Sequence, residues 1–437
     1  MNNGIMDINR RTAYEVLLEI EEKEAFSNIS LNRYMERNAP DSPKFVRELV
    51  YGVLENKIYI DFLISHYLKR GVRPLRVRES TLLRMGMYQL EFMDSVSNYG
   101  TVNEMVNLAK KYCKGREGFI NAVLRSHLRR KNPIELPDRG KDETIYLATK
   151  YSYAPWIVEL ILEEYGPQAE GILMAGNRRA DLVLRVNALK ISAPLLMMRL
   201  EEKGFQASAS LLVSEGIKVK GEGVLSDTMY EEGLFSVQDE ASMIAVKTLD
   251  PKPGERLIDM CAAPGGKTFF SAELMGNTGK IIAGDFYDKK LERMTEEARR
   301  LGISIVETKA WDGTRILKEY EEFADRVLAD VPCSGLGVVR RKPEIKYKEF
   351  SREMEELPKK QLAILKTASR YCRTGGTVVY STCTIIQREN QKVVEEFLRE
   401  NANFEMIEEH KLLPHQQGTD GFYIAKMRKN ASEKGKL

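Results

Sequence analysis

The chain has 437 residues, of which 43% are hydrophobic and 30% charged, and its formal net charge is +3. This length exceeds one typical domain, and the composition is that of a folded globular protein, which excludes extensive disorder. No uninterrupted apolar run reaches the roughly 18 residues of a membrane span, and the stretch MNNGIMDINRRTAYEV has no apolar signal-peptide core. We therefore expect a cytoplasmic protein of two to four compact units with no membrane partner.

The five cysteines are Cys113, Cys261, Cys333, Cys372 and Cys383. An odd number of scattered thiols, with no C-x-x-C pair and no histidine at metal-ligand spacing, predicts neither a disulfide framework nor a metal site. The mildly basic net charge neither requires nor excludes a nucleic-acid partner, so local clusters must decide that question.

Residues 1–135 are predicted to form an all-helical domain, because apolar residues recur there at three- and four-residue spacing. Thr101-Val102-Asn103-Glu104 has the form of a capping box that opens the helix NEMVNLAKKYC. The segment KNPIELPDRGKDE that follows is charged and contains two prolines and a glycine. It is typical of a linker between domains.

Residues 145–235 are predicted to form a small α+β module. Pro155 suits the first turn of a helix through WIVELILEEYG, which Gly166-Pro167 should end. A strand LVLRVNAL, a helix APLLMMRLEEKGF and short strands in IKVKGEG and GLFSVQD follow. Arg178-Arg179 and Arg185 are candidates for phosphate contacts, although a solvated surface is the commoner role of such residues.

Residues 236–430 alternate between strands and helices. The predicted strands are RLIDM, KIIAGD, ISIVET, DRVLAD, TVVYST, FEMIEE and GFYIAKM. This alternation predicts a Rossmann-like α/β domain with a parallel sheet covered on both faces, and ligands of such folds bind outside the carboxyl ends of the strands. The chain is therefore expected to be multidomain, with helical, α+β and α/β parts.

The stretch DMCAAPGGKT nearly matches a phosphate-binding P-loop, but Cys261 stands where the first glycine belongs. Cys261 and Pro264 would also restrict a loop that must wrap phosphates with free amides, so a nucleoside triphosphate is disfavoured. The Gly265-Gly266 turn at a helix N-terminus still lets a ligand approach the backbone closely.

Asp285 ends the next predicted strand, and it has the spacing of about 20 residues after the glycines that is typical of an acid binding both ribose hydroxyls. This favours a cofactor that contains adenosine with free hydroxyls. The pattern by itself does not separate NAD from S-adenosylmethionine.

Cys333 in ADVPCSGLG and Cys383 in YSTCT each follow a predicted strand, and in a doubly wound sheet these ends converge on one cleft together with Asp330. Two thiols there suit methylation at C5 of a pyrimidine, because that carbon is a poor nucleophile until a thiolate adds at C6. Asp330 near N3 would stabilise the electron-rich adduct. Cys113 and Cys372 are expected to be small buried hydrophobes.

The motifs DMCAAPGGKT, DVPCSGLG and YSTCT, in this order and spacing, resemble the RNA 5-methylcytosine methyltransferase family (NOL1/NOP2/Sun). This resemblance implies that Cys383 is the nucleophile, that Cys333 assists breakdown of the covalent adduct, and that S-adenosylmethionine is the cofactor. It implies cofactor contacts by Cys261, Ala262, Ala263, Pro264, Gly265, Gly266, Lys267, Asp285, Asp312 and Asp330.

The segments TVNEMVNLAKKYC and GFINAVLRSHLRR resemble the last helices of the NusB fold, an RNA-binding helical domain. The order of the three domains is similar to that of bacterial enzymes that modify one cytosine of 16S rRNA. The resemblance therefore implies 16S rRNA as the partner, naked or early in assembly, and a monomer is favoured.

Arg340, Arg341 and Lys342, followed by Lys346, lie in the loop after Cys333, where they could hold RNA phosphates. A solvated loop is the alternative. Two other functions stay open, namely methylation of tRNA and a non-catalytic role as an RNA-binding assembly or transcription factor. A DNA methyltransferase is disfavoured, because in that family the Pro-Cys thiol is the nucleophile and Cys383 would have no required role.

Overall fold

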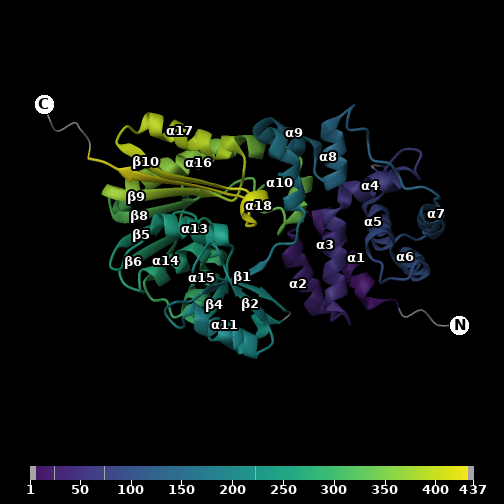
Figure 1. The fold of residues 1–437 in the computed structure, drawn as a ribbon, viewed down its shortest axis with the longest axis horizontal. Helices are drawn as coiled ribbons and strands as arrows, with labels where there is room; N and C mark the ends of the chain where they lie inside the picture. The colour runs from purple at the N-terminus through teal and green to yellow at the C-terminus, as the bar shows by residue number, and fades with distance from the viewer. Residues whose placement is uncertain (1–5, 24, 73, 222, 432–437) are drawn as a thin grey trace. The chain divides into compact units, whose positions relative to one another are not determined.

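The computed structural model describes residues 6–23, 25–72, 74–221 and 223–431, so residues 1–5 of the N-terminal stretch considered above lie outside the described residues. The chain forms two compact units. Unit 1 comprises the residues up to 177 together with 339–349, and unit 2 comprises 178–338 and the residues from 350 onward (Figure 1).

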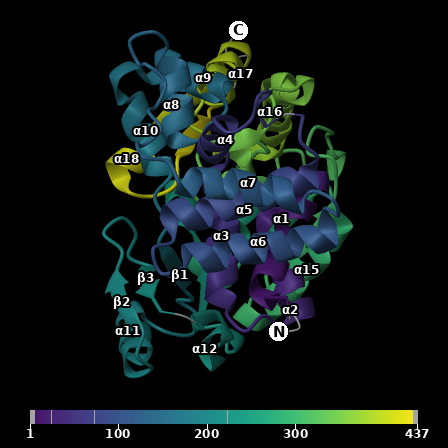
Figure 2. The ribbon, with the colours of Figure 1, turned by 90° about the vertical axis from the view of Figure 1, so that its right-hand side faces the viewer.

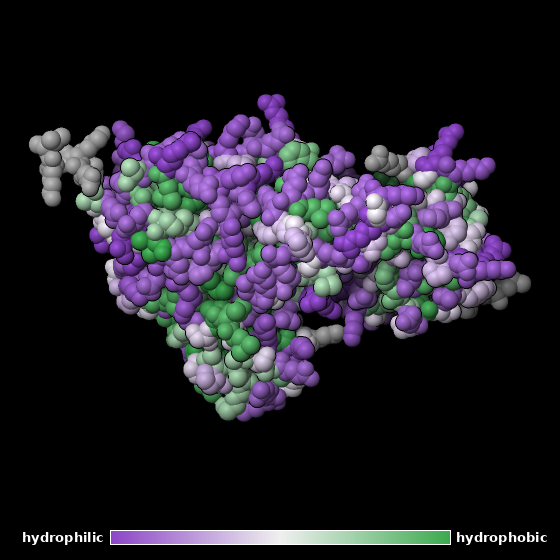
Figure 3. All heavy atoms as spheres, turned by 45° about the horizontal axis from the view of Figure 1, so that its top comes forward, coloured by the Kyte–Doolittle hydropathy of each residue, from purple (hydrophilic) through white to green (hydrophobic). Residues whose placement is uncertain are grey.

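In the described part of the chain, no helix is both long and apolar enough to span a bilayer. On the face drawn in Figure 3, hydrophilic residues predominate and hydrophobic residues form small groups between them. That face therefore presents mainly polar groups to its surroundings.

Unit 1 is helical. Its elements are α1 (Ile8–Lys23), α2 (Ser27–Asn38), α3 (Pro43–Glu55), α4 (Lys57–Ser65), α5 (Val77–Phe92), α6 (Asn98–Tyr112), α7 (Glu117–Leu128), α8 (Glu143–Tyr151), α9 (Pro155–Tyr165), η1 (Gly166–Gln168), α10 (Ala169–Gly176) and η4 (Pro343–Tyr347). Helices α1, α3, α5, α6 and α7 pack side by side (Figure 2). Pro155 is the first residue of α9 and Tyr165 its last, as the sequence predicts.

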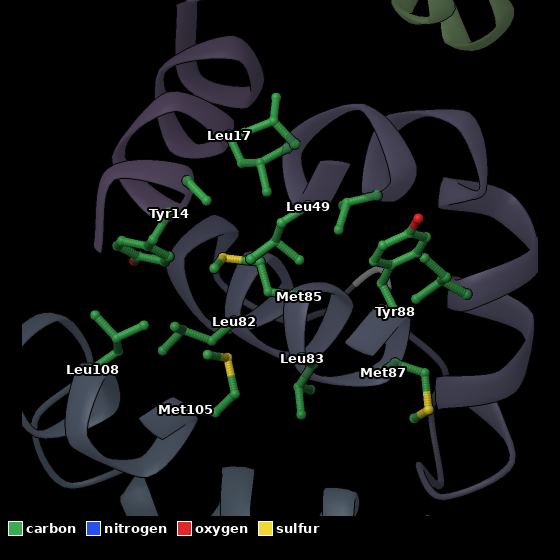
Figure 4. Close-up of a cluster of buried hydrophobic side chains, with 14 of the residues drawn as sticks. Tyr14, Leu17, Leu49, Leu82, Leu83, Met85, Met87, Tyr88, Met105 and Leu108 are labelled. Carbon is green, nitrogen blue, oxygen red and sulfur yellow. The ribbon is translucent and has the colours of Figure 1, made fainter. Parts of the chain in front are cut away.

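Helix α5 is the centre of the unit 1 core. Its residues Leu82, Leu83 and Met85, which point in different directions from the helix, are all fully buried, so the helix contacts neighbours on several sides. Figure 4 shows their side chains between those of α1, α3 and α6. Gly52 in α3 admits the Tyr88 ring, because a Cβ at Gly52 would lie 1.9 Å from that ring. Side-chain packing at this density stabilises the helical unit.

The predicted capping box at Thr101 and Glu104 is wrong. Helix α6 begins at Asn98, and Ser97 is its N-cap, with Oγ accepting a hydrogen bond from the amide of Gly100 at 3.3 Å. Thr101 lies within the helix, fully buried. Serine is at least as good an N-cap as threonine, so the helix began at the earlier of two suitable residues.

The described residues of unit 2 form two sheets. The smaller part comprises β1 (Leu182–Val186), α11 (Ala193–Glu202), β2 (Gln206–Ala209), β3 (Gly216–Lys220), η2 (Val224–Ser226), α12 (Thr228–Glu231) and β4 (Phe235–Val237). These strands form an antiparallel sheet in the order β2-β3-β1-β4.

The larger part begins at residue 240. It comprises α13 (Glu240–Leu249), β5 (Arg256–Asp259), α14 (Gly266–Leu274), β6 (Lys280–Asp285), α15 (Asp288–Leu301), β7 (Val306–Ala310), η3 (Lys318–Tyr320), β8 (Ala324–Asp330), α16 (Arg352–Tyr371), β9 (Cys372–Thr382), η5 (Gln387–Glu389), α17 (Gln391–Glu400), β10 (Phe404–Leu412), α18 (Pro414–Gln417) and β11 (Phe422–Lys429). The sheet order is β10-β11-β9-β8-β5-β6-β7, and only the pairs that involve β10 and β11 are antiparallel.

Helices cover both faces of this sheet, with α16 and α17 on one side and α13 and α14 on the other (Figure 1). Neighbouring residues of one strand pack into two different hydrophobic cores, one on each face of the sheet. Ile258 of β5 packs in the core that contains Leu365 of α16, whereas Leu257 packs in the core that contains Ala245 of α13. A strand buried on both faces reads as a continuous apolar run, which is why the sequence predicted this sheet.

Candidate functional site

The candidate site lies at the carboxyl edge of the seven-stranded sheet. Strands β9, β8, β5 and β6 are neighbours in this order, and all three pairs are parallel. Their carboxyl ends therefore lie along one edge. At or just after these ends stand Cys383, Cys333 with Asp330, Asp259 and Asp285.

The loop between β5 and α14 turns at a glycine. Gly265 has a φ of 105°, and a Cβ there would lie 2.4 Å from the Phe269 ring. The amide of Ala262 donates to the carbonyl of Gly284 at 2.8 Å, which ties the loop to β6. Of the residues with an implied cofactor contact in this loop, Pro264 is exposed, Cys261, Ala263, Gly266 and Lys267 are half-buried, and Ala262 and Gly265 are buried. The turn leaves the backbone at the start of α14 open to close approach.

Asp285 links this loop to the end of β6. Its carboxylate accepts hydrogen bonds from the amides of Ala263 and Tyr287, both at 3.2 Å. Each carboxylate oxygen has a second lone pair, so the side chain can still accept hydrogen bonds from a ligand. Asp285 is thus a fixed acceptor next to the Gly265 turn.

Asp312 follows β7 at the same edge. Its Oδ1 accepts hydrogen bonds from the Oγ1 and amide of Thr314, at 2.7 and 3.0 Å, and these bonds hold the pKa of Asp312 below its usual value. The preceding Trp311 donates from Nε1 to the carbonyl of Met260 at 3.0 Å. Its ring covers Gly284, where a Cβ would lie 1.7 Å from the indole. Asp312 is therefore an ionised carboxylate on a firmly packed loop.

Asp259 is a buried acid between β5 and α14. Its Oδ2 accepts a hydrogen bond from Thr268 Oγ1 at 2.7 Å, whereas Oδ1 is buried with no hydrogen-bond partner among the described residues. Burial raises the pKa of Asp259 to about 7. The orphaned oxygen leaves one acceptor position for a ligand donor.

Asp330 ends β8 between a cation and a hydroxyl. Lys267 Nζ donates to its Oδ2 at 2.8 Å and Ser381 Oγ to its Oδ1 at 2.7 Å. Burial lowers the pKa of Lys267, but the charge and hydrogen bond of Asp330 outweigh burial, so that pKa lies above its usual value. Lys267 is thus a cation, and Asp330 is held at two points.

The two thiols that the sequence places after β8 and β9 lie together. The Sγ atoms of Cys333 and Cys383 are 3.2 Å apart, and both residues are half-buried. The hydrogen bond with Cys383, then burial, then the charges of Cys383 and Glu389 raise the pKa of Cys333 well above its usual value. The two thiols are therefore close enough to contact the same ligand, and their surroundings differ.

The other three thiols have raised pKa values. Cys113 and Cys372 are buried, which confirms the sequence prediction. Burial raises the pKa of Cys113, raises that of Cys372 to about 12, and raises that of Cys261 well above its usual value. Because the thiolate is the reactive form, these cysteines make poor nucleophiles.

The predicted phosphate contact of Arg185 is wrong. Its guanidinium is fully buried and forms an ion pair with Glu273 at 2.7 Å, while Nη1 donates to the carbonyl of Gly266 at 2.7 Å. Two residues on, Asn187 donates from Nδ2 to the carbonyl of Leu301 at 2.9 Å. Both residues join the small sheet to the larger α/β part. The arginine within the predicted strand LVLRV could have indicated this structural role, because a buried arginine needs an ion-pair partner.

Residues 339–349 pack within unit 1, although they are inserted between β8 and α16 of unit 2. Lys342 is exposed, and Arg340 and Arg341 are half-buried. The suggested RNA contact of Lys346 is wrong, because this side chain is buried and Nζ donates to the carbonyl of Glu55 at 2.7 Å and to Asn177 Oδ1 at 2.8 Å. The loop is therefore in part a packing element of the helical unit.

The pH dependence of unfolding tests the buried Lys346. Burial lowers the pKa of Lys346 from 10.5 to about 7. Between these pH values the unfolded chain binds a proton that the folded protein does not, so the folded state gains stability as the pH rises. We expect the free energy of unfolding of the wild type, minus that of Lys346→Met, to increase by up to about 1.4 kcal/mol per pH unit from pH 7 to 9.

Denaturant titrations of both proteins at pH 7, 8 and 9 measure this difference, and Lys342→Met is the exposed control. A difference that stays flat or falls with pH would mean that Lys346 remains charged in the folded protein.

Within the described residues, no group of three or more His, Cys, Asp or Glu side chains is placed to hold a metal ion. The described residues include all five cysteines, and none of them forms a disulfide. The side chains at this edge include two thiols, several carboxylates and the Lys267 ammonium.

Known proteins match each part of the chain. Residues 246–428 match the family described as 16S rRNA methyltransferase RsmB/F, residues 7–129 match the NusB family, and residues 153–225 match the ferredoxin-like domain of RsmF/B-like methyltransferases. The expected fold class, with a NusB-like helical part, a small α+β module and a Rossmann-like α/β domain, is confirmed.

Two relatives match almost end to end. The probable ribosomal RNA small subunit methyltransferase B of Bacillus subtilis (strain 168) is 34% identical over 444 residues, which cover 96% of this chain and 98% of the relative. The ribosomal RNA small subunit methyltransferase B of Escherichia coli (strain K12) is 29% identical, with 94% and 96% covered. A crystal structure of a methyltransferase homolog from Pyrococcus horikoshii has a TM-score of 0.60 at 28% identity and covers 66% of this chain and 99% of its own.

Proposed function

This chain belongs to the ribosomal RNA small subunit methyltransferase B family, and from that premise we propose that it transfers a methyl group from S-adenosylmethionine to C5 of a cytosine in 16S rRNA. The observation that carries the choice of C5 is the pair of thiols 3.2 Å apart at the ends of β8 and β9. Methyl transfer to an oxygen or an exocyclic nitrogen needs no thiol. Methyl transfer to C5 does, because that carbon becomes nucleophilic only after addition at C6.

In this proposal Cys383 is the nucleophile and Cys333 serves the breakdown of the adduct. The Cys383 thiolate forms a bond to C6, which places electron density at C5. After C5 has gained the methyl group, a base takes the C5 proton, the electrons of the C5–H bond restore the C5–C6 double bond, and the C6–S bond breaks, which returns the Cys383 thiolate. Asp330, held by Lys267 and Ser381, would share a proton with N3 and stabilise the electron-rich ring.

The residues of the sheet edge fit S-adenosylmethionine. The cofactor, when bound, supplies an electrophilic methyl group. Asp285 would accept hydrogen bonds from the ribose hydroxyls, and the narrow turn at Gly265 would let the ligand approach the backbone. The unpartnered Oδ1 of Asp259 offers a further acceptor for a donor group. Cys261 and Lys267 lie on either side of the Gly265 turn, and Asp312 and Asp330 lie after β7 and at the end of β8 on the same edge of the sheet. We assign all four to the cofactor site.

Loss of the Asp285 carboxylate is expected to weaken cofactor binding by about 10- to 100-fold, since a hydrogen bond to a charged acceptor contributes about 1.5–3 kcal/mol. Isothermal titration of Asp285→Ala with S-adenosylmethionine measures this. Asp288→Ala is the matched control, because Asp288 is the next acid along the chain and is exposed. Equal affinities of wild type and Asp285→Ala would contradict the assignment.

The RNA substrate must expose its target base. A stacked cytosine would have to be extruded, which costs a few kcal/mol and favours loops or incompletely assembled RNA. Arg340, Arg341 and Lys342 are proposed to contact RNA phosphates, and we expect these contacts to weaken with salt.

Methyl transfer from labelled S-adenosylmethionine to naked 16S rRNA, to assembled small subunits and to tRNA tests the proposal, with digestion to identify the modified base. 5-Methylcytosine in naked 16S rRNA is the expected result and would place the enzyme early in assembly. Label in tRNA alone would overturn the substrate. No transfer to any RNA would favour the non-catalytic assembly or transcription factor.

A further inference from the structure

A buried carboxylate holds the backbone around Cys333. Glu389, at the end of η5, is fully buried, and its Oε2 accepts hydrogen bonds from the amide of Ser334 at 2.8 Å and from Gln361 Nε2 at 3.0 Å. The same Gln361 nitrogen donates to the carbonyl of Pro332 at 3.0 Å. The residues on both sides of Cys333 are therefore fixed by one carboxylate and one amide.

The loop that carries Cys383 is tied to the same place. The hydroxyls of Ser334 and Thr384 lie 2.8 Å apart, so the residues that directly follow the two cysteines are hydrogen-bonded. Asn390, next to Glu389, donates from Nδ2 to the carbonyl of Thr384 at 3.0 Å. These bonds give the two thiols a fixed mutual position.

Within the described residues, Glu389 forms no ion pair, and its Oε1 is buried with no hydrogen-bond partner. A buried carboxylate without a counter-charge is costly for folding, and such groups are kept where they serve a site. The negative charge of Glu389 acts on the nearby thiol of Cys333.

Charges of opposite sign act on the two thiols. The Lys267 ammonium, which is ion-paired with Asp330 at 2.8 Å, interacts electrostatically with Cys383. The Glu389 carboxylate interacts electrostatically with Cys333. Tyr380 of β9 also interacts with Cys333 and Glu389, but burial keeps its pKa far above its usual value, so it is neutral.

An anion disfavours a second negative charge beside it, and a cation favours one. Two thiols at hydrogen-bonding distance do not both ionise, because the first thiolate opposes the second. We propose that Glu389 is a positioning residue that anchors the Cys333 loop and keeps the shared proton on Cys333, so that the thiolate forms on Cys383. This proposal rests on the proposed function, in which Cys383 is the nucleophile. The different charges near the two thiols would explain why the thiolate forms on Cys383 rather than on Cys333.

The test is the pH dependence of alkylation of each thiol in the free protein. The full chain is treated with iodoacetamide from pH 6 to 10, and mass spectrometry of peptides gives the rate at each cysteine. In the wild type we expect Cys383 to reach half of its maximal rate at a lower pH than Cys333. In Glu389→Gln, which keeps the shape and an acceptor oxygen but loses the charge, the midpoint of Cys333 should move down by about one pH unit, a change of about tenfold in thiolate fraction.

Two variants separate charge from packing. Ser334→Ala removes the hydrogen bond to Thr384 without a change of charge, and Glu395→Gln removes the next acid along the chain, which is exposed. Both should leave the Cys333 midpoint unchanged. A Glu389→Gln midpoint equal to that of the wild type, or an equal shift in Ser334→Ala, would overturn the proposal.

The buried Cys113 and Cys372 report unfolding, because they react only if the core opens. If Cys113 and Cys372 react in Glu389→Gln, this variant has opened its core, and Glu389→Asp is used in its place. Aspartate keeps the carboxylate but is shorter by one methylene. A smaller downward shift of the Cys333 midpoint then supports the proposal, and no shift overturns it. Methyl transfer is measured separately, so absence of transfer with the expected thiol midpoints would reject the proposed function while the role of Glu389 stands.

Discussion

Cys383→Ala is expected to abolish methyl transfer to RNA, with a loss of at least about 10⁴-fold, because removal of a covalent nucleophile leaves only binding and positioning to accelerate the reaction. Cys383 follows β9 at the carboxyl edge of the sheet, 3.2 Å from Cys333 and within the electrostatic reach of the Lys267 ammonium. Without this thiol, nothing adds to C6, and C5 remains unreactive. Incorporation of labelled methyl into 16S rRNA under single-turnover conditions measures the loss.

The matched control is Cys372→Ala, because Cys372 begins the same strand, and burial raises its pKa to about 12. It should retain methyl transfer. Cofactor affinity of Cys383→Ala, measured by titration, should equal that of the wild type, which would show that the loss lies in the chemistry. Substantial methylation by Cys383→Ala would reassign the nucleophile.

Much of the fold could be predicted from the sequence, because the signals are local. Strands such as β5 and β6 are short apolar runs between turn residues, and Asp285 ends β6 as predicted. The sequence did not predict the strand β2, since Gln206–Ala209 is a four-residue edge strand whose apolar residues are two alanines, which give a weak signal. The order of strands in the sheet depends on contacts between distant segments, which no local pattern contains.

The sequence allowed us to predict which loops form the candidate site. The rule that ligands bind at the carboxyl ends of parallel strands placed Cys333, Cys383 and Asp330 together, and their atoms do lie at one edge. The sequence did not reveal Glu389, because an acid in a helical segment is almost always a solvated one. Only the burial of its carboxylate against the Cys333 loop identifies it.

At the candidate site and in the loop after Cys333, two wrong predictions concern basic residues. Arg185 and Lys346 are candidates for phosphate contacts in the sequence because they are basic, one in the small α+β module and the other in the loop after Cys333. Arg185 is instead neutralised by Glu273, and burial lowers the pKa of Lys346 to about 7. In each case a partner far away in the sequence decides the environment, and a single sequence does not name that partner.

Cys333→Ala is expected to have the opposite signature to Cys383→Ala, namely a stable covalent complex between protein and RNA. Addition of Cys383 to C6 and gain of the methyl group do not require Cys333. Release does require a group next to the adduct that moves a proton, and Cys333 is the thiol within hydrogen-bonding distance of Cys383. We expect turnover to fall by about 10²- to 10⁴-fold, the range typical of general acid–base catalysis.

Denaturing gel electrophoresis with labelled RNA detects the complex as a slowly migrating band that survives heating in detergent. The band should require S-adenosylmethionine, and it should be absent from the double variant Cys333→Ala, Cys383→Ala, because the bond to RNA is made by Cys383. Normal turnover of Cys333→Ala without a band would remove Cys333 from the reaction. A band that persists in the double variant would place the covalent bond on another residue, and the division of roles between the two thiols would then be wrong.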